Sequence, residues 1–133
     1  MNDWGAEEKL LAGLLLDEEG AAQIDTVAAL VQPEDFADKR LRGVYAEMLE
    51  LRREGAAITV DSLVANRGED RDYLVGLCPV ASNLAFYAEG IREAAKRRRL
   101  IAVTEQVAKL AKAFHGSANE LQAAAELAIR RAG

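Results

Sequence analysis

The fold of this 133-residue chain is decided by residues 82–131, whose sequence is SNLAFYAEGIREAAKRRRLIAVTEQVAKLAKAFHGSANELQAAAELAIRR. Proline is absent from this stretch, and Gly90 alone interrupts the good helix formers of its first half. Gly116 stands where a helix end favours a residue without a Cβ. Ser117 and Glu120 then form the S-x-x-E pattern that begins a helix. The stretch therefore predicts a long helix, a tight turn and a second helix, an αα-hairpin.

The long helix carries two apolar stripes that point in nearly opposite directions. At about 100° per residue, the stripe containing Leu84 and Ile91 lies about 150° from the stripe that begins at Leu100. The second helix is rich in alanine, which buries little area, so we expect the hairpin to need a partner helix pair from another subunit. The subunit interface is expected to contain Leu100, Val103, Val107, Leu110, Phe114, Leu121 and Ala125.

The length of this helix has a consequence for its surroundings. A straight rod of about 31 residues would reach about 46 Å, whereas the rest of the chain should form a globule about 30 Å across. The far end of a straight helix would therefore leave the globule. A kink near Ala95–Arg98 is the alternative.

Composition indicates an all-α protein, because half of the residues are apolar, only two are proline, and strand-like alternation is rare. We expect a compact head of about five to six helices over residues 1–81 and a protruding dimerisation hairpin over residues 82–133. Helices are predicted at residues 6–16, 21–31, 39–54, 59–68 and 72–78. Gly13 would cost its helix about 1 kcal/mol relative to alanine, which predicts that another helix packs closely against it.

The expected cellular compartment is inferred from the cysteine count, the first residues and the longest apolar run. Its single cysteine, Cys78, excludes an intramolecular disulfide and suits a reducing environment. Residues 1–8 carry no basic segment typical of a signal peptide. The longest apolar run, Leu10–Leu16, is far shorter than the roughly 20 residues needed to span a bilayer. We expect a cytoplasmic protein that does not contact membranes.

The net charge of −5 hides an asymmetry. Residues 1–90 hold 8 basic and 18 acidic side chains, whereas residues 91–133 hold 9 basic and 4 acidic ones. An acidic head and a basic hairpin could steer the assembly of copies, or attract an acidic partner. Two solvated faces are the simpler interpretation.

No catalytic constellation is visible, and we expect no cofactor or metal in this chain. A phosphate-binding loop needs a Gly-Lys pair, and none occurs. His115 is expected to act as a cation at a helix C-terminus, and Cys78 as a small core residue; so far apart, they cannot form a zinc site. The carboxylates at residues 7–8, 17–19 and 70/72 are expected to complement helix dipoles.

Four consecutive basic residues, Lys96-Arg97-Arg98-Arg99, form a cluster of the kind that is typical of nucleic-acid-binding proteins. Four consecutive helical residues fan over roughly 300° of the helix circumference, however, and no aromatic residues interleave with them to stack on bases. We therefore favour contacts between subunits or solvation over direct DNA contact. Trp4 is either an apolar anchor or part of a disordered end.

An ordered set of short pieces runs along nearly the whole chain: Ala6-Glu7, Leu11, Gly13, Leu14-Leu15-Leu16-Asp17, Asp35-Phe36, Arg42, Val44-Tyr45, Gly55, Ile58, Ser62-Leu63, Tyr73-Leu74, Pro79, Asn83, Tyr87-Ala88, Arg92-Glu93 and Arg99-Leu100-Ile101. This order resembles the N-terminal domain of the DnaB-type replicative DNA helicases of bacteria or phages. The chain departs from the family pattern at Leu41, Ala37 and Thr59, lacks the Gly-Gly before Tyr73, and has Lys96-Arg97 where leucines are usual.

The resemblance implies a non-catalytic domain that ties six subunits into a ring collar through paired hairpins and docks the helicase-binding domain of primase or a helicase loader. ATP and Mg²⁺ would belong only to the motor domain of such a helicase. One alternative is a free-standing adaptor with the related fold of a primase helicase-binding domain. Another is an autonomous nucleic-acid-binding protein built on the basic hairpin.

Overall fold

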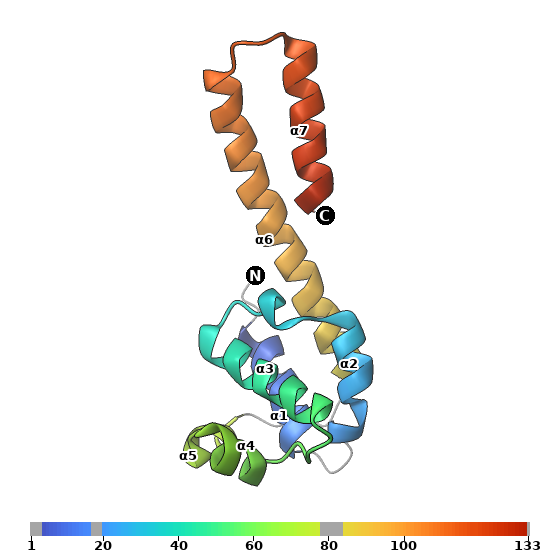
Figure 1. Cartoon of the computed structure of the whole chain (residues 1–133), viewed down its shortest axis with the longest axis vertical. Coiled ribbons are helices and arrows are strands. Elements are labelled where there is room, and N and C mark those ends of the chain that lie inside the picture. The colour runs from blue at the N-terminus through green and yellow to red at the C-terminus, as the bar shows by residue number, and fades with distance from the viewer. Residues whose placement is uncertain (1–3, 17–19, 78–83, 133) are drawn as a thin grey trace. The chain divides into compact units, whose positions relative to one another are not determined.

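A computed structural model describes residues 4–16, 20–77 and 84–132 of the chain, and all of its regular elements in these ranges are helices. The α-helices are α1 (Trp4–Leu16), α2 (Ile24–Leu30), α3 (Lys39–Arg53), α4 (Val60–Arg67), α5 (Arg71–Val75), α6 (Leu84–Ala113) and α7 (Ala118–Ala132). Two 3-10 helices, η1 (Gly20–Gln23) and η2 (Pro33–Asp35), flank α2 (Figure 1). The all-α prediction is confirmed.

The chain forms two compact units, residues 1–92 and residues 93–133, so that the boundary falls inside α6. The first unit contains α1 to α5 and the first turns of α6, and the second contains the rest of α6 with α7. Ser82 and Cys78 lie outside the described residues. The predicted division at residues 81 and 82 therefore stays a prediction.

The core of the first unit is built on α3. Its apolar residues recur at helical spacing, and five of them, Leu41, Val44, Tyr45, Met48 and Leu51, are buried. The ring of Tyr45 stacks on Phe36 with a centroid distance of 4.9 Å. Its buried hydroxyl donates a hydrogen bond to the Val31 carbonyl at 2.8 Å, which satisfies the polar end of the side chain.

α1 approaches the first turn of α6 closely at Gly13. A Cβ built on Gly13 would collide with the side chain of Leu84, which is itself buried. The prediction that another helix packs against Gly13 is therefore confirmed. The absence of a side chain at Gly13 lets Leu84 occupy the space against α1.

The ends of α4 and α5 are fixed by local signals. The Thr59 side chain caps the N-terminus of α4 by accepting a hydrogen bond from the Ser62 amide. Gly68 ends α4 with a φ of +71°, a conformation that favours glycine. Asp70 caps α5 by accepting hydrogen bonds from the amides of Asp72 and Tyr73.

Two predicted boundaries were wrong. The helix expected over residues 21–31 is divided into η1 and α2, so its first turn is a 3-10 helix. The helix expected over residues 72–78 ends at Val75, because Gly76 follows as its C-cap and glycine is a poor helix former.

The second unit is an antiparallel hairpin of the later part of α6 and α7 (Figure 1). α6 is a single 30-residue helix that continues through the positions where a kink was considered. Ser117 caps α7 by accepting a hydrogen bond from the Glu120 amide at 3.1 Å, as the S-x-x-E pattern predicted. Gly116 does not adopt a positive φ. Its lack of a Cβ instead makes room for the Phe114 ring and the Glu120 carboxylate.

Candidate subunit interface

The hairpin unit lacks a core of its own. From residue 96 to residue 132 every side chain is described and not one is buried. α7 has apolar residues on one face, yet none of its 15 residues is buried. An amphipathic helix normally gains its stability by burying that face. Within this chain, the apolar face of α7 stays partly open to solvent.

The seven predicted interface residues fall into two groups. Leu110 is exposed, with 41% of its surface accessible. The other six are half-buried: Leu100, Val103, Val107, Phe114, Leu121 and Ala125. Their spacing of three and four residues keeps the α6 members on one face of the helix.

Large exposed apolar side chains concentrate on the hairpin unit. Of the six found in the described part of the chain, Ile101 (51% exposed), Leu110, Leu127 (44%) and Ile129 (41%) belong to this unit. Ile101, Leu127 and Ile129 were not among the predicted interface residues. Ile101 is next to Leu100 in the sequence but lies outside the stripe that begins there, and Leu127 and Ile129 are apolar residues of α7. Exposed apolar side chains gathered on one unit are typical of an interaction surface.

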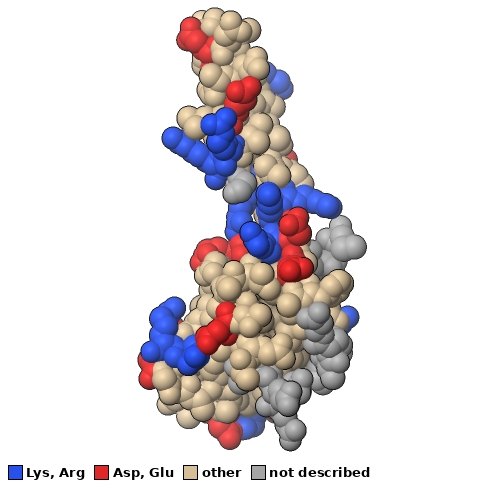
Figure 2. Space-filling model, turned by 90° about the vertical axis from the view of Figure 1, so that its right-hand side faces the viewer, with Lys and Arg blue, Asp and Glu red and all other residues tan. Residues whose placement is uncertain are grey.

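The charges of the two units have opposite sign. Residues 1–92 carry 9 basic and 18 acidic side chains, a net charge of −9, and residues 93–133 carry 8 basic and 4 acidic ones, a net charge of +4. All four residues of the run Lys96–Arg99 are exposed. Basic side chains accordingly stand out on the hairpin surface in Figure 2.

The other residues that the sequence singled out include a histidine and a group of carboxylates, for which structural roles were expected. His115 is exposed, two residues beyond the end of α6. Glu7 lies in the first turn of α1, but its carboxylate is buried and accepts hydrogen bonds from the amides of Ala37 at 2.8 Å and Asp38 at 3.0 Å. The helix-dipole interpretation of Glu7 was incomplete, since this contact with a distant loop has no local sequence signal. The side chain of Trp4 and residues 17–19 lie outside the described part.

One carboxyl group of the first unit has a strongly shifted pKa. Burial, together with the hydrogen bond and charge of Glu69, raises the pKa of Glu47 to about 7. Arg67, which pairs with Glu54 at 2.7 Å, opposes this shift. Among the described residues, no group of three or more His, Cys, Asp or Glu side chains is arranged to hold a metal ion.

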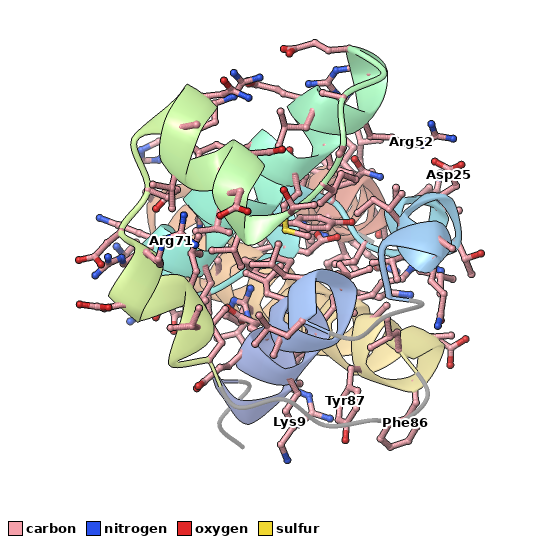
Figure 3. The ribbon with its side chains drawn as sticks, turned by 90° about the horizontal axis from the view of Figure 1, so that it is seen from below. Lys9, Asp25, Arg52, Arg71, Phe86 and Tyr87 are labelled. Carbon is pink, nitrogen blue, oxygen red and sulfur yellow. The ribbon has the colours of Figure 1, made fainter. Side chains whose placement is uncertain are left out.

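The surface of the first unit also carries an ion pair, a cation–π contact and an aromatic pair. Arg52 binds both carboxylate oxygens of Asp25, at 3.0 and 2.7 Å, and this hydrogen bonding lowers the pKa of Asp25. Lys9 lies over the ring of Tyr87, which meets Phe86 edge-on, along one side of the unit (Figure 3). Phe86 is 68% exposed.

Comparison with known proteins identifies the fold. The family model described as the DnaB-like helicase N-terminal domain matches residues 1–93. The chain belongs to this family. The crystal structure of the N-terminal domain of DnaB helicase from Mycobacterium tuberculosis is similar over 96% of each chain, with 26% sequence identity and a TM-score of 0.79.

As a DnaB N-terminal domain, the chain is a non-catalytic part of a replicative helicase, and membership of the family implies an oligomeric helicase assembly. The family model ends at the boundary between the two units, whereas the similarity to the mycobacterial structure extends over the hairpin as well. In the described ranges, no helix has the length and apolar character required to cross a membrane.

Proposed function

We propose that this DnaB N-terminal domain is an assembly module whose α6–α7 hairpin pairs with that of another subunit to form the collar of a helicase ring. The observation that carries the proposal is the absence of any buried residue from 96 to 132. A helix of 15 residues is marginal in water without tertiary packing. A second hairpin would supply that packing through the exposed and half-buried apolar residues.

The collar would also dock the helicase-binding domain of primase or a helicase loader. Membership of the family supports this role. Because the chain departs from the family pattern at Lys96 and Arg97, the docking surface would differ there in charge. Binding of a purified primase helicase-binding domain, followed by calorimetry, tests this role directly. ATP and Mg²⁺ are assigned to the motor of the helicase, since no Gly-Lys pair occurs in these 133 residues.

Assembly through the hairpin is tested by Leu110→Asp. Leu110 is accessible in the single chain, so the substitution leaves the fold of the subunit intact while placing a charge in the interface. Loss of about 2 kcal/mol of apolar burial would weaken association roughly thirtyfold. The mass in solution, measured by sedimentation velocity over a dilution series, should fall to that of one chain, with the far-UV circular dichroism retained.

The matched control is Ala102→Asp. Ala102 is exposed on the same helix and the substitution makes the same change of charge, but Ala102 lies about 80° around the helix from Leu110. This variant should associate like the wild-type chain. If Leu110→Asp and the wild-type chain have the same mass at every concentration, hairpin assembly is wrong.

Nucleic-acid binding is the second candidate, because Lys96–Arg99 are all exposed on a unit of net positive charge. Fluorescence anisotropy with single-stranded DNA at 50 and 200 mM salt distinguishes the two functions. For the assembly module we expect weak binding that changes little when all four residues are replaced by glutamine. A tight complex that weakens steeply with salt and is lost in the glutamine variant would favour the nucleic-acid function.

A further inference from the structure

A cleft of about 390 Å³ opens on the first unit, between α1, the N-terminus of α3 and α5. Its floor is apolar, formed by the buried residues Leu41 and Leu77. One wall is the half-buried ring of Tyr73. The rim carries three carboxylates from separate elements, Glu8, Asp38 and Asp72.

This combination of groups suits the side chain of an arginine or a lysine. The aliphatic part of such a side chain can lie on an apolar floor while its charged end reaches carboxylates. A guanidinium already contacts the wall of the cleft, since Arg40 lies over the ring of Tyr73 at 3.5 Å from the centroid. Burial and the negative charges of Asp38 and Glu8 raise the pKa of Tyr73, which reflects the negative potential there.

The second unit offers a side chain of matching chemistry. Arg97 and Ile101 are four residues apart on α6, so they lie on one face, and both are exposed. This face points about 120° away from the mean direction of the stripe that begins at Leu100. The pair therefore presents a cation next to an exposed apolar side chain, on a unit whose net charge is opposite to that of the unit with the cleft.

We propose that the cleft of one copy binds Arg97 of a second copy, with Ile101 packing beside it against the apolar floor. This inference rests on the proposed function, because it adds a second contact between subunits to the pairing of hairpins. The guanidinium would bind the carboxylates of Asp72 and Glu8 and stack on Tyr73. The contact accounts for the opposite charges of the two units.

The test reverses one charge on each side. Arg97→Glu and Asp72→Lys should each weaken self-association about tenfold or more, measured by sedimentation velocity at 50 mM salt. An equimolar mixture of the two variants restores an opposite-charge pair and should associate more tightly than either variant alone. Only a contact between copies produces that recovery.

The controls make the same changes of charge elsewhere. Lys109→Glu alters an exposed residue on the same helix as Arg97, and Glu34→Lys alters an exposed residue of the first unit that does not line the cleft. Both should associate within about twofold of the wild-type chain, because isolated surface charges contribute little.

Three results overturn the proposal: Arg97→Glu associating like Lys109→Glu, a mixture that associates no more tightly than its components, or a lower melting temperature with unchanged mass, which would place the contact within one chain. Comparison with Leu110→Asp separates the two proposals. If Leu110→Asp abolishes self-association and Arg97→Glu leaves it unchanged, the proposed cleft contact is wrong and the hairpin pairing stands. If Arg97→Glu weakens self-association and Leu110→Asp does not, the proposed pairing of hairpins is wrong and the cleft contact stands.

Discussion

Glu7 and Glu47 are two carboxyl groups of the first unit with opposite surroundings. Glu7 is buried and binds two backbone amides, which favours its ionised form. Glu47 has a side-chain oxygen that is buried without a hydrogen-bond partner among the described residues, and its neighbours include Glu69 and Glu50. Ionisation of Glu47 is therefore unfavourable in the folded chain.

The raised pKa of Glu47 predicts a pH dependence of stability. Its carboxyl binds a proton more tightly in the folded chain, with a pKa of about 7, than in the unfolded chain, where the ordinary value is 4.5. The stabilisation from this group is complete below about pH 4.5 and is lost as the pH rises through 7. Urea unfolding midpoints between pH 5 and 8 should fall for the wild-type chain and should fall less for Glu47→Gln.

The control for this measurement is Glu89→Gln, which removes an exposed carboxylate of the same unit. Its profile should follow that of the wild-type chain. A Glu47→Gln profile that runs parallel to the wild-type profile over this range would contradict the role of Glu47.

At Gly13, the contact between α1 and α6 leaves no room for a side chain, because a Cβ would collide with Leu84. Gly13→Val would push against Leu84, and overpacking of this kind should lower the free energy of unfolding by about 1–3 kcal/mol. Gly43→Val is the matched substitution, because a side chain on Gly43 in α3 meets open space. It should be neutral or slightly stabilising, since valine is a better helix former than glycine. Equal stabilities of the two variants would show that the contact is unimportant.

The whole molecule combines a unit with a core and a unit without one. The buried apolar residues come from α1, α3 and the other elements of the first unit together with the first turns of α6, whereas residues 96–132 contribute none. Local opening should therefore be easier in the second unit when the chain is alone. Association would stabilise that unit by mass action, since only the paired hairpin buries its apolar face.

This difference predicts a concentration-dependent pattern of amide hydrogen exchange. At the lowest concentrations, amides of α7 and of the later part of α6 should exchange at least a hundredfold faster than those of α3. At high concentration their protection should rise, while that of α3 stays constant. Mass spectrometry of peptides after exchange measures both. Equal protection of α7 at all concentrations would contradict stabilisation by assembly.

Local patterns predicted much of the fold correctly. The spacing of apolar residues in α3 placed its buried face, and Thr59 and Gly68 marked the ends of α4. The apolar stripe that begins at Leu100 indicated a surface that one chain does not bury, and no residue from 96 to 132 is buried. These features depend on residues within one or two turns of each other, so their signal lies in the order of the sequence.

The sequence by itself determined the helices, their caps and the apolar faces that need covering, because each follows from short-range geometry. The tertiary structure alone decided that Glu7 binds amides 30 and 31 residues away, and that Glu8, Asp38 and Asp72 meet around one cleft. It also decided that Ile101 and Leu127 stay exposed. Such contacts depend on how separate helices pack in space, and the packing is set by the sum of many weak interactions that no local pattern records.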